Sequence, residues 1–340
     1  MRGEGSPDIF SRSPWPPVPS VTYFHSRASP EIVDSVTHAL AASSIFLALG
    51  HPGLVPFAAL GSVSMDFDVL LMRFPEKNPR YYVFTHGGFT HSIAGSLIIG
   101  SIVFAAVAAL TLWGPAAWLF GAGLGVAGLL ALLAGALTHV LCDFLAYPGI
   151  PVFYPFTDRK FTLGVFAGPS IFLLAVSWAY LVALVLSLAT VAEYRIWAAI
   201  FLGYIGLKVL LKLYMAATTD GATIPTKNPF RWFVIREEDG SYAIQSRYLL
   251  SGLTEPRVFP KLRGVEPAEV EQYRDLPEVR RHTYNSYITT VEKNGDTITF
   301  RDPFRSEGYT PYPFHHATVD VLSGKAVPTG SKTGDHPPGS

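Results

Sequence analysis

The 340-residue sequence predicts a mainly α-helical membrane protein: a polytopic bundle of about six helices, the first two short, followed by a small, mostly β domain. Charged residues make up 15% of the chain, whereas an ordinary soluble domain has about 25%. The mean hydropathy is positive, at +0.29. Apolar residues dominate positions 92–214 and charged residues follow position 218, which indicates a membrane part and then a soluble part.

Apolar segments of about 20 residues are long enough to cross the hydrocarbon core of a bilayer. Four confident spans meet this condition: 92–112, 116–141, 171–189 and 196–215. Two shorter helical candidates precede them, at 32–49 and 54–71. The Gly-His-Pro-Gly stretch between these two predicts a sharp turn and therefore a helical hairpin. The sequence leaves open whether this hairpin crosses the membrane fully or is partly re-entrant.

The remaining chain divides by composition. Residues 1–31 are rich in Pro, Ser and Arg and predict a disordered arm, and residues 327–340 predict a disordered tail. The membrane helical domain would then occupy 32–216 and a β-rich domain 217–326. In the latter, Asp239-Gly240 and Asn294-Gly295 each separate two strand-like runs, which is the strongest short-range signal for a β-hairpin.

Basic residues in short loops predict the orientation of the bundle. If the hairpin enters and leaves the membrane once, two loops share a side and carry these basic residues: Arg73, Lys77, Arg80, Arg159 and Lys160. The opposite side has only Arg195. We therefore expect both termini and the β domain to be cytosolic. The formal net charge of zero and a pI near 7.2 give no indication of a nucleic-acid partner.

Imidazoles and carboxylates gather at the helix ends on this same side. Four separate segments contribute them: Asp34 and His38; Asp66 and Asp68; His86 and His91; His139 and Asp143. Ionisable groups at membrane depth are costly unless they are paired or functional. A divalent cation would reverse the mutual repulsion of the carboxylates. The convergence therefore predicts a metal site with these ligands: His38, Asp66, Asp68, His86, His91, His139 and Asp143.

The donor types indicate the metal and its chemistry. A His/Asp set without thiolate suits Zn²⁺ best, with Mn²⁺ and Fe²⁺ as alternatives, and more than four ligands can hold one or two ions. The single cysteine, Cys142, offers no cysteine metal site. A bound metal lowers the pKa of water toward neutrality, so hydrolysis is the reaction class that follows. Three further residues are expected to orient the ligands: Asp34, Thr90 and Ser92.

The motifs resemble a known family. "DSVTHA" (34–39), "SMDFD" (64–68), "THGGFTHS" (85–92) and "THVLCDFLAYPGIPVFYPFTDRKFTLG" (138–164) are similar to the YdjM-type inner-membrane proteins, which are described as membrane-bound metal-dependent hydrolases. The resemblance covers about 34–215. It implies location in the inner membrane of a prokaryote. Val69 and Gly87 stand where that family usually has His and Arg.

The leading interpretation is a metal-dependent hydrolase of an ester or phosphoester bond in a membrane lipid or lipid-linked substrate. Asp66 or Asp68 would act as general base, and Arg159 and Lys160 would hold an anionic headgroup. One alternative is a divalent-cation transport or sensing site, although the four confident spans lack charge at mid-depth. Another is a metal-stabilised scaffold whose β domain is an interaction module, for which Val69 and Gly87 are the motive.

Overall fold

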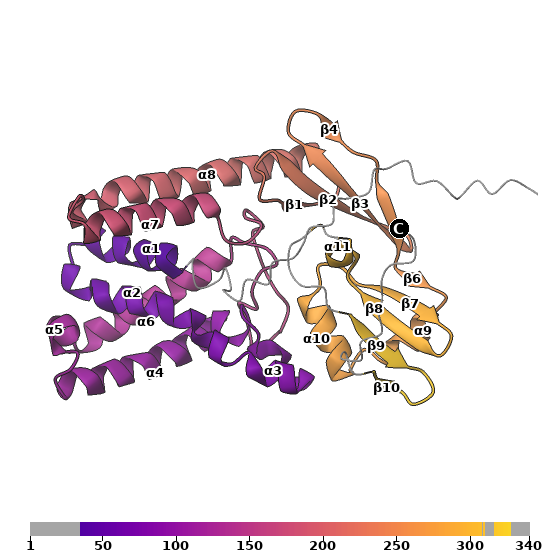
Figure 1. Ribbon diagram of the computed structural model, residues 1–340, viewed down its shortest axis with the longest axis horizontal. Helices are drawn as coiled ribbons and strands as arrows, with labels where there is room; N and C mark the ends of the chain where they lie inside the picture. Colours follow the sequence, from indigo (N-terminus) through magenta and orange to yellow (C-terminus); the bar gives the residue numbers. More distant parts are fainter. Residues whose placement is uncertain (1–34, 308, 310–315, 328–340) are drawn as a thin grey trace, which may run out of the picture.

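The computed structural model describes residues 35–307, 309 and 316–327. The predicted arm at 1–31, Asp34 and the tail beyond Val327 lie outside the described residues. Within them, the expected architecture is confirmed: a helical bundle is followed by a region built of β-sheets (Figure 1).

From Ser35 onward, where the described residues begin, eight α-helices and several 3₁₀ turns build the bundle. The α-helices are α1 (Ser35–Ala48), α2 (Val55–Val63), α3 (Arg73–Lys77), α4 (Ile93–Leu112), α5 (Ala117–Phe120), α6 (Val126–Asp143), α7 (Ile171–Val185) and α8 (Tyr194–Thr218). The 3₁₀ turns are η1 (Pro52–Leu54), η2 (Ser64–Leu70), η3 (Pro79–Phe84), η4 (Phe89–His91), η5 (Gly121–Gly123) and η6 (Val191–Glu193). The short helix α3 lies at the end of the bundle that faces the β-sheets (Figure 1).

Within the described part of the chain, four helical segments are long and apolar enough to cross a membrane: Pro52–Pro75, Ile93–Leu112, Val126–Asp143 and Val191–Thr218. This set differs in one member from the four confident spans of the sequence. The second helix of the hairpin continues through η2 into a 24-residue segment. By contrast, α7 has 15 residues, because the chain leaves the helix before Ser187, which takes a φ of 57°.

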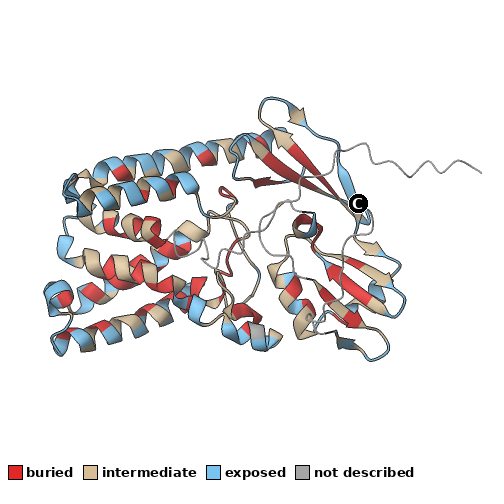
Figure 2. Cartoon of the chain, viewed as in Figure 1, coloured by how far each residue is buried: buried red, intermediate tan, exposed pale blue. Residues whose placement is uncertain are grey.

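The outer surface of the bundle is apolar. In Figure 2, the buried residues of the helices face neighbouring helices, and exposed residues cover the outside. Many of these exposed side chains are large and hydrophobic, such as Ile98 and Ile102 of α4 and Leu202 and Leu210 of α8. Lipid chains accept such a surface, whereas water does not.

Helices α2 and α6 cross closely because glycines stand at the contact. A Cβ on Gly61 would lie 1.9 Å from the carbonyl oxygen of Leu132, and one on Gly135 would lie 2.0 Å from that of Ala58. Small residues at such crossings let two helix backbones approach closely. Close packing then stabilises the helix pair in a membrane, where the hydrophobic effect does not drive helices together. The crossing matters for the site below, since η2 directly follows α2 and the end of α6 carries two of its residues.

We predict that Gly135→Ala destabilises the protein by about 1–3 kcal/mol or more, because the added methyl group forces α2 away from α6. Gly203→Ala in α8 is the matched control, since nothing lies within 4 Å of a Cβ built there. That change should be neutral or stabilise by about 0.5–1 kcal/mol, the usual gain of alanine over glycine in a helix. Thermal unfolding of both variants in one detergent measures the difference; equal melting temperatures would contradict the close crossing.

The described residues of the C-terminal region form two five-stranded sheets. The strands are β1 (Ala222–Pro225), β2 (Arg231–Glu238), β3 (Ser241–Tyr248), β4 (Gly252–Leu253), β5 (Arg257–Pro260), β6 (Leu262–Arg263), β7 (Thr290–Asn294), β8 (Thr297–Arg301), β9 (Ala317–Asp320) and β10 (Lys325–Ala326). The first sheet has the order β1-β2-β3-β4, with β5 also paired to β3. The second has the order β10-β9-β8-β7-β6 and is antiparallel except for β6 and β7.

Both predicted hairpins are present in these sheets. Glu238 pairs with Ser241, so Asp239-Gly240 forms the turn between β2 and β3. In the second hairpin Asn294 pairs with Thr297, and the turn is therefore Gly295-Asp296, one residue later than the sequence predicted. Three short helices that the alternating pattern did not reveal complete the region: α9 (Pro267–Glu271), α10 (Pro277–Asn285) and α11 (Pro303–Ser306).

Helix α10 attaches the sheets to the loops of the bundle. Arg280 donates to the phenolic oxygen of Tyr82 at 2.8 Å, and that hydroxyl donates to Asp158 at 2.5 Å. Arg281 donates to the Pro75 carbonyl at 3.0 Å. Partial burial, and then the bond to Asp158, raise the pKa of Tyr82 to about 12, so this hydroxyl stays protonated. Helix α10 thus joins the β region to the loops at one end of the bundle.

Candidate metal centre

Six predicted ligands converge at the end of the bundle nearest the sheets. They come from five separate elements: His38 from α1, Asp66 from η2, His86 from the loop before η4, His91 from η4, and His139 and Asp143 from α6. On α6 the spacing of four residues places His139 and Asp143 on one face. His91 lies in the 3₁₀ turn just before α4 and not in the first turn of that helix.

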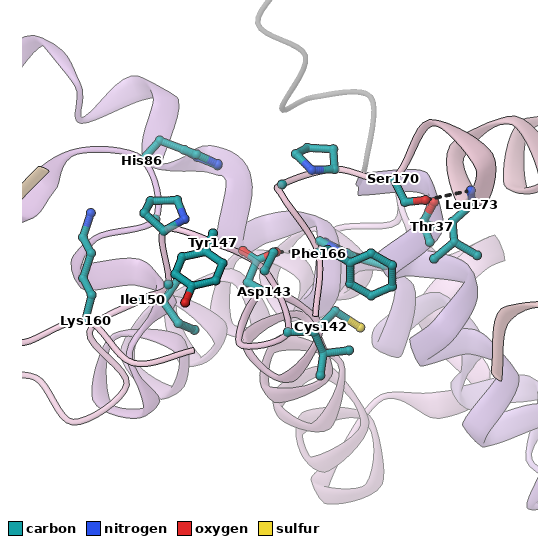
Figure 3. Close-up of a pocket in the computed structure, with 18 of the residues that line it drawn as sticks. Thr37, His86, Cys142, Asp143, Tyr147, Ile150, Lys160, Phe166, Ser170 and Leu173 are labelled. Carbon is teal, nitrogen blue, oxygen red and sulfur yellow. Dashed lines mark hydrogen bonds and ion pairs between the residues drawn. The ribbon is translucent and has the colours of Figure 1, made fainter. Parts of the chain in front are cut away.

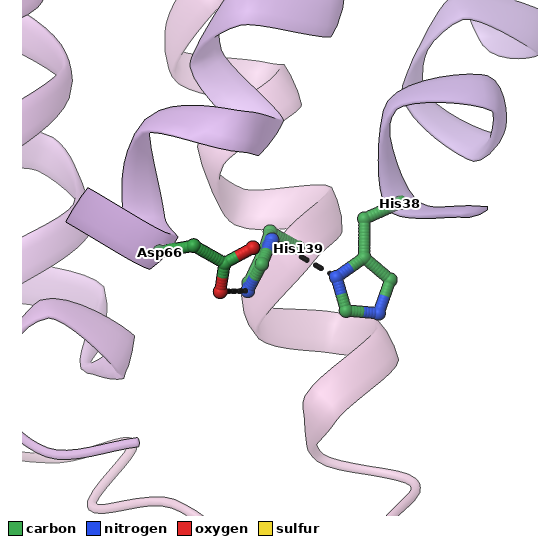
Figure 4. A group of neighbouring side chains, drawn as sticks. All are labelled: His38, Asp66 and His139. Carbon is green, nitrogen blue, oxygen red and sulfur yellow. Dashed lines mark hydrogen bonds and ion pairs between the residues drawn. The ribbon is translucent and has the colours of Figure 1, made fainter. Parts of the chain in front are cut away.

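His139 lies at the centre of this group. Its Nδ1 is 3.0 Å from Nδ1 of His38, and its Nε2 is 3.2 Å from Nε2 of His91. Two carboxylates face the same Nε2, with Oδ1 of Asp66 at 3.5 Å and Oδ2 of Asp143 at 3.4 Å. Figure 4 shows the ring of His139 between Asp66 and His38, each presented by a different helix.

The spacing of these atoms fits metal coordination. Three overlapping groups each have one donor atom per residue within 4.8 Å of the others: His38, Asp66 and His139; Asp66, His86 and His91; and His91, His139 and Asp143. Around a tetrahedral ion with bonds of about 2.1 Å, neighbouring ligand atoms lie about 3.4 Å apart. The Nε2 atoms of His91 and His139, 3.2 Å apart, and Oδ2 of Asp143, 3.1 Å and 3.4 Å from them, come close to that separation, and a buried His/Asp cluster that could hold a metal ion is therefore present.

Asp68 has different surroundings from Asp66. Successive residues of a 3₁₀ helix are rotated by about 120°, so residues two apart face different directions. Asp68 is 1% exposed and accepts hydrogen bonds from Nδ1 of His86 at 2.9 Å, Oγ1 of Thr90 at 2.9 Å and the backbone N–H of Gly87 at 3.3 Å. It also lies 3.3 Å from Nδ1 of His91. None of the three ligand groups of the described residues includes it.

Hydrogen bonds to Asp68 thus hold the loop that carries His86 and His91 in place. Gly87 takes a φ of 67°, and a Cβ on Gly88 would lie 2.0 Å from the carbonyl oxygen of Val83. Both glycines of the "THGG" stretch are therefore needed for the path of the chain. Ser92 follows as the N-cap of α4 and accepts from the N–H of Gly95 at 2.9 Å.

Residues 33–218 match the family described as YdjM inner membrane protein. The chain belongs to this family. A comparison with curated proteins finds no match, and neither does one with solved structures. The match spans the whole helical bundle and the residues of the cluster, and it ends where the β-sheets begin. Together with the four apolar helices, it identifies the chain as a membrane protein.

The two positions at which this YdjM family member differs from the expected motifs have different environments. Val69 is 37% exposed and follows Asp68 on η2. Gly87 lines a pocket beside the cluster and contributes only backbone to it. At position 87 the side chain is therefore missing from the pocket, whereas at position 69 it belongs to the outer surface.

This pocket has a volume of about 220 Å³ and lies directly against the cluster. His38, His86 and Asp143 belong to its lining, and Figure 3 labels the last two. Of the two predicted headgroup residues, Lys160 lines this pocket. Arg159 does not; it lines a second, larger pocket of about 870 Å³ between the loop and the β region.

Sequence reasoning missed two residues of the pocket that come from the C-terminal region. Arg305 of α11 and Asn285 of α10 line it beside Lys160. They lie more than 100 positions from the nearest cluster residue, and nothing in their local sequence distinguishes them from surface residues. Only the fold brings them to the pocket.

Proposed function

We propose that this YdjM family member is a metal-dependent hydrolase that cleaves an ester or phosphoester bond of a lipid or lipid-linked substrate. The observation that carries the proposal is the position of the His/Asp cluster, which is buried on its helical side and forms the wall of a pocket on the other. Ligands that were purely structural would have no need of that pocket.

His38, His86, His91, His139, Asp66 and Asp143 would hold the ion or ions, and their nitrogen-rich composition favours Zn²⁺ over Mn²⁺ and Fe²⁺. When bound, a divalent ion supplies Lewis acidity that activates water and stabilises negative charge on the cleaved group. Asp66 is the candidate general base, because its Oδ1 faces the cluster while its Oδ2 accepts a hydrogen bond from Ser35.

Asp68 would act through the histidines. Its carboxylate accepts the Nδ1 proton of His86, which leaves the other ring nitrogen of His86 available as a ligand. The hydroxyl of Thr90 donates a hydrogen bond to the same carboxylate. The proposal thus assigns the two aspartates of the "SMDFD" motif to different tasks.

Elemental analysis and turnover on the purified protein test the proposal together. We expect at least one Zn²⁺, Mn²⁺ or Fe²⁺ ion per chain, and hydrolysis of at least one member of a panel of lipid esters and phosphoesters that stops on chelation and returns with the metal. Stoichiometric metal without turnover on any member would instead favour a sensing, transport or scaffold role. If the purified protein bound no metal, neither the hydrolase nor the sensing, transport or scaffold role would be supported.

A further inference from the structure

The pocket beside the metal cluster has two unlike ends. Figure 3 shows Lys160 at one end, Asp143 near the middle, and Phe166 and Leu173 toward the other. The apolar end is completed by Phe201 and Ile205 of α8. Since α8 is long and apolar enough to cross the membrane, this end adjoins the lipid-facing part of the bundle.

The opposite end is cationic. Lys160 lies with its Nζ 4.3 Å from the centre of the Tyr284 ring, and among the described residues no carboxylate comes within ion-pair distance of it. Burial, and secondarily the charge of Arg305, lower the pKa of Lys160 to about 7. The ammonium group is therefore held where its own charge is unfavourable.

Arg305 is positioned by a buried carboxylate. Its side chain is 10% exposed, and its Nε lies 3.4 Å from Oδ2 of Asp302, which is fully buried. Asp302 itself accepts from the backbone N–H groups of Phe304 at 3.0 Å and Tyr287 at 2.8 Å. These bonds fix the start of α11 and hence the direction from which Arg305 reaches the pocket.

Two cations that share a partly buried pocket repel each other, and Asp302 forms its ion pair with Arg305 and not with Lys160. A bound anion would offset this repulsion and replace the lost hydration of both groups. Phosphate fits the pair well, because its oxygens accept hydrogen bonds from guanidinium and ammonium groups together. The apolar end in turn matches a hydrocarbon chain.

We propose that Lys160 and Arg305 bind the phosphate of an anionic amphiphile whose apolar chain lies against α7 and α8, so that the C-terminal β region takes part in substrate selection. This inference rests on the proposed function for its catalytic meaning. It names the substrate class as a phosphorylated lipid or lipid-linked phosphate. In a pocket of about 220 Å³ the headgroup and the first part of the chain would be enclosed, with the remainder in the membrane.

Cys142 provides a readout that does not depend on turnover. It is the single cysteine of the chain and lines the pocket between the two ends (Figure 3). Ligand in the pocket should therefore slow its alkylation by a small maleimide. The protein would be reconstituted with its metal into phosphatidylcholine nanodiscs, with or without a non-hydrolysable phosphonate analogue of phosphatidic acid.

We expect the phosphonate lipid to slow alkylation of Cys142 in the wild type. In Arg305→Met and Lys160→Met, the concentration that gives half protection should rise roughly tenfold, as for loss of a charge-assisted hydrogen bond. Arg263→Met and Lys325→Met are the matched controls, since both side chains are exposed on the β region away from the pocket. They should protect like the wild type.

Metal content and melting temperature distinguish binding from folding. Lys160→Met should not lower the melting temperature, because the substitution removes a charge that burial disfavours. Equal protection in all five proteins would overturn the inference, as would equal protection by inorganic phosphate, which lacks the chain. Protection that depends on Lys160 and Arg305 without hydrolysis of any lipid would support the binding site and reject the hydrolase. If both variants hydrolysed phospholipids as fast as the wild type, the result would support the hydrolase and reject the binding site.

Discussion

Replacing His139 by alanine is expected to release the bound metal and to lower the stability of the protein to below that of the metal-free wild type. His139 faces His38 through one ring nitrogen and His91, Asp66 and Asp143 through the other. Its loss therefore removes a donor from two of the three ligand groups at once. Substitution of residues that merely orient ligands already costs about 10- to 100-fold in metal affinity, and loss of a ligand should cost more.

The stability effect follows from linkage. A metal that binds only the folded state stabilises it by about 2.7 kcal/mol at a free concentration 100 times its Kd. Thermal unfolding with and without a chelator measures this contribution, and elemental analysis gives the stoichiometry. Chelation should lower the melting temperature of the wild type and leave that of His139→Ala unchanged.

A buried imidazole also fills space, so part of the effect of His139→Ala comes from packing. The chelated wild type separates the two contributions, because it lacks the metal and retains the ring. His51→Ala is the matched control: His51 is exposed at η1, outside the cluster, and its loss should alter neither metal content nor stability. If His139→Ala purified with as much metal as the wild type, the cluster would not be the metal site.

The sequence predicted the bundle because the requirement is strong and local. A span needs a long run of predominantly apolar residues, and α4, α6 and α8 each contain one. The hairpin turns of the β region were also readable, since Asp-Gly and Asn-Gly favour the backbone of tight turns. The one-residue shift at Gly295-Asp296 arises from pairing between β7 and β8, which no turn signal specifies.

The cluster was predictable for a related reason. Imidazoles and carboxylates are conspicuous at the ends of apolar segments, and counting helices places them on one side. What the sequence does not contain is the direction of each side chain. Asp66 and Asp68 are the same residue type in the same short motif. Only the 3₁₀ path of η2 directs Asp66 toward His139 and Asp68 toward Nδ1 of His86.

The pocket was the least predictable feature. Arg159 and Lys160 are neighbours in the sequence, yet only Lys160 reaches the pocket beside the cluster. Arg305 arrives from α11 because the β region docks on η3 and the loop at 158–160 through Arg280 and Tyr284. Such contacts depend on how the helical bundle and the β region meet, and neither part encodes them alone.

Asp66→Asn is expected to retain metal and to lose most of its hydrolytic turnover. Asparagine keeps the shape and the carbonyl oxygen of the side chain, and five other ligand residues remain around the site. It cannot accept a proton, so a general base at this position would be lost, with a fall in kcat of about 10²- to 10⁴-fold.

Asp68→Asn should behave differently, because the Asp68 carboxylate accepts hydrogen bonds from His86, Thr90 and the Gly87 backbone. An amide there places an N–H₂ group against one of these donors and disturbs the orientation of His86. We expect metal affinity to fall by about 10- to 100-fold, and turnover to recover in part when excess metal is supplied. Asp66→Asn should show no such recovery.

Metal titrations of turnover on the lipid substrate found in the panel compare these variants, with Asp296→Asn in the exposed β7–β8 turn as the control. The decisive quantity is kcat at saturating metal. A value for Asp66→Asn equal to that of the wild type would exclude Asp66 as the base and move that role to Asp143, the other carboxylate within 4 Å of His91 and His139. If kcat at saturating metal falls for Asp66→Asn alone and the metal stays bound, proton transfer is assigned to Asp66, whose carboxylate faces the cluster.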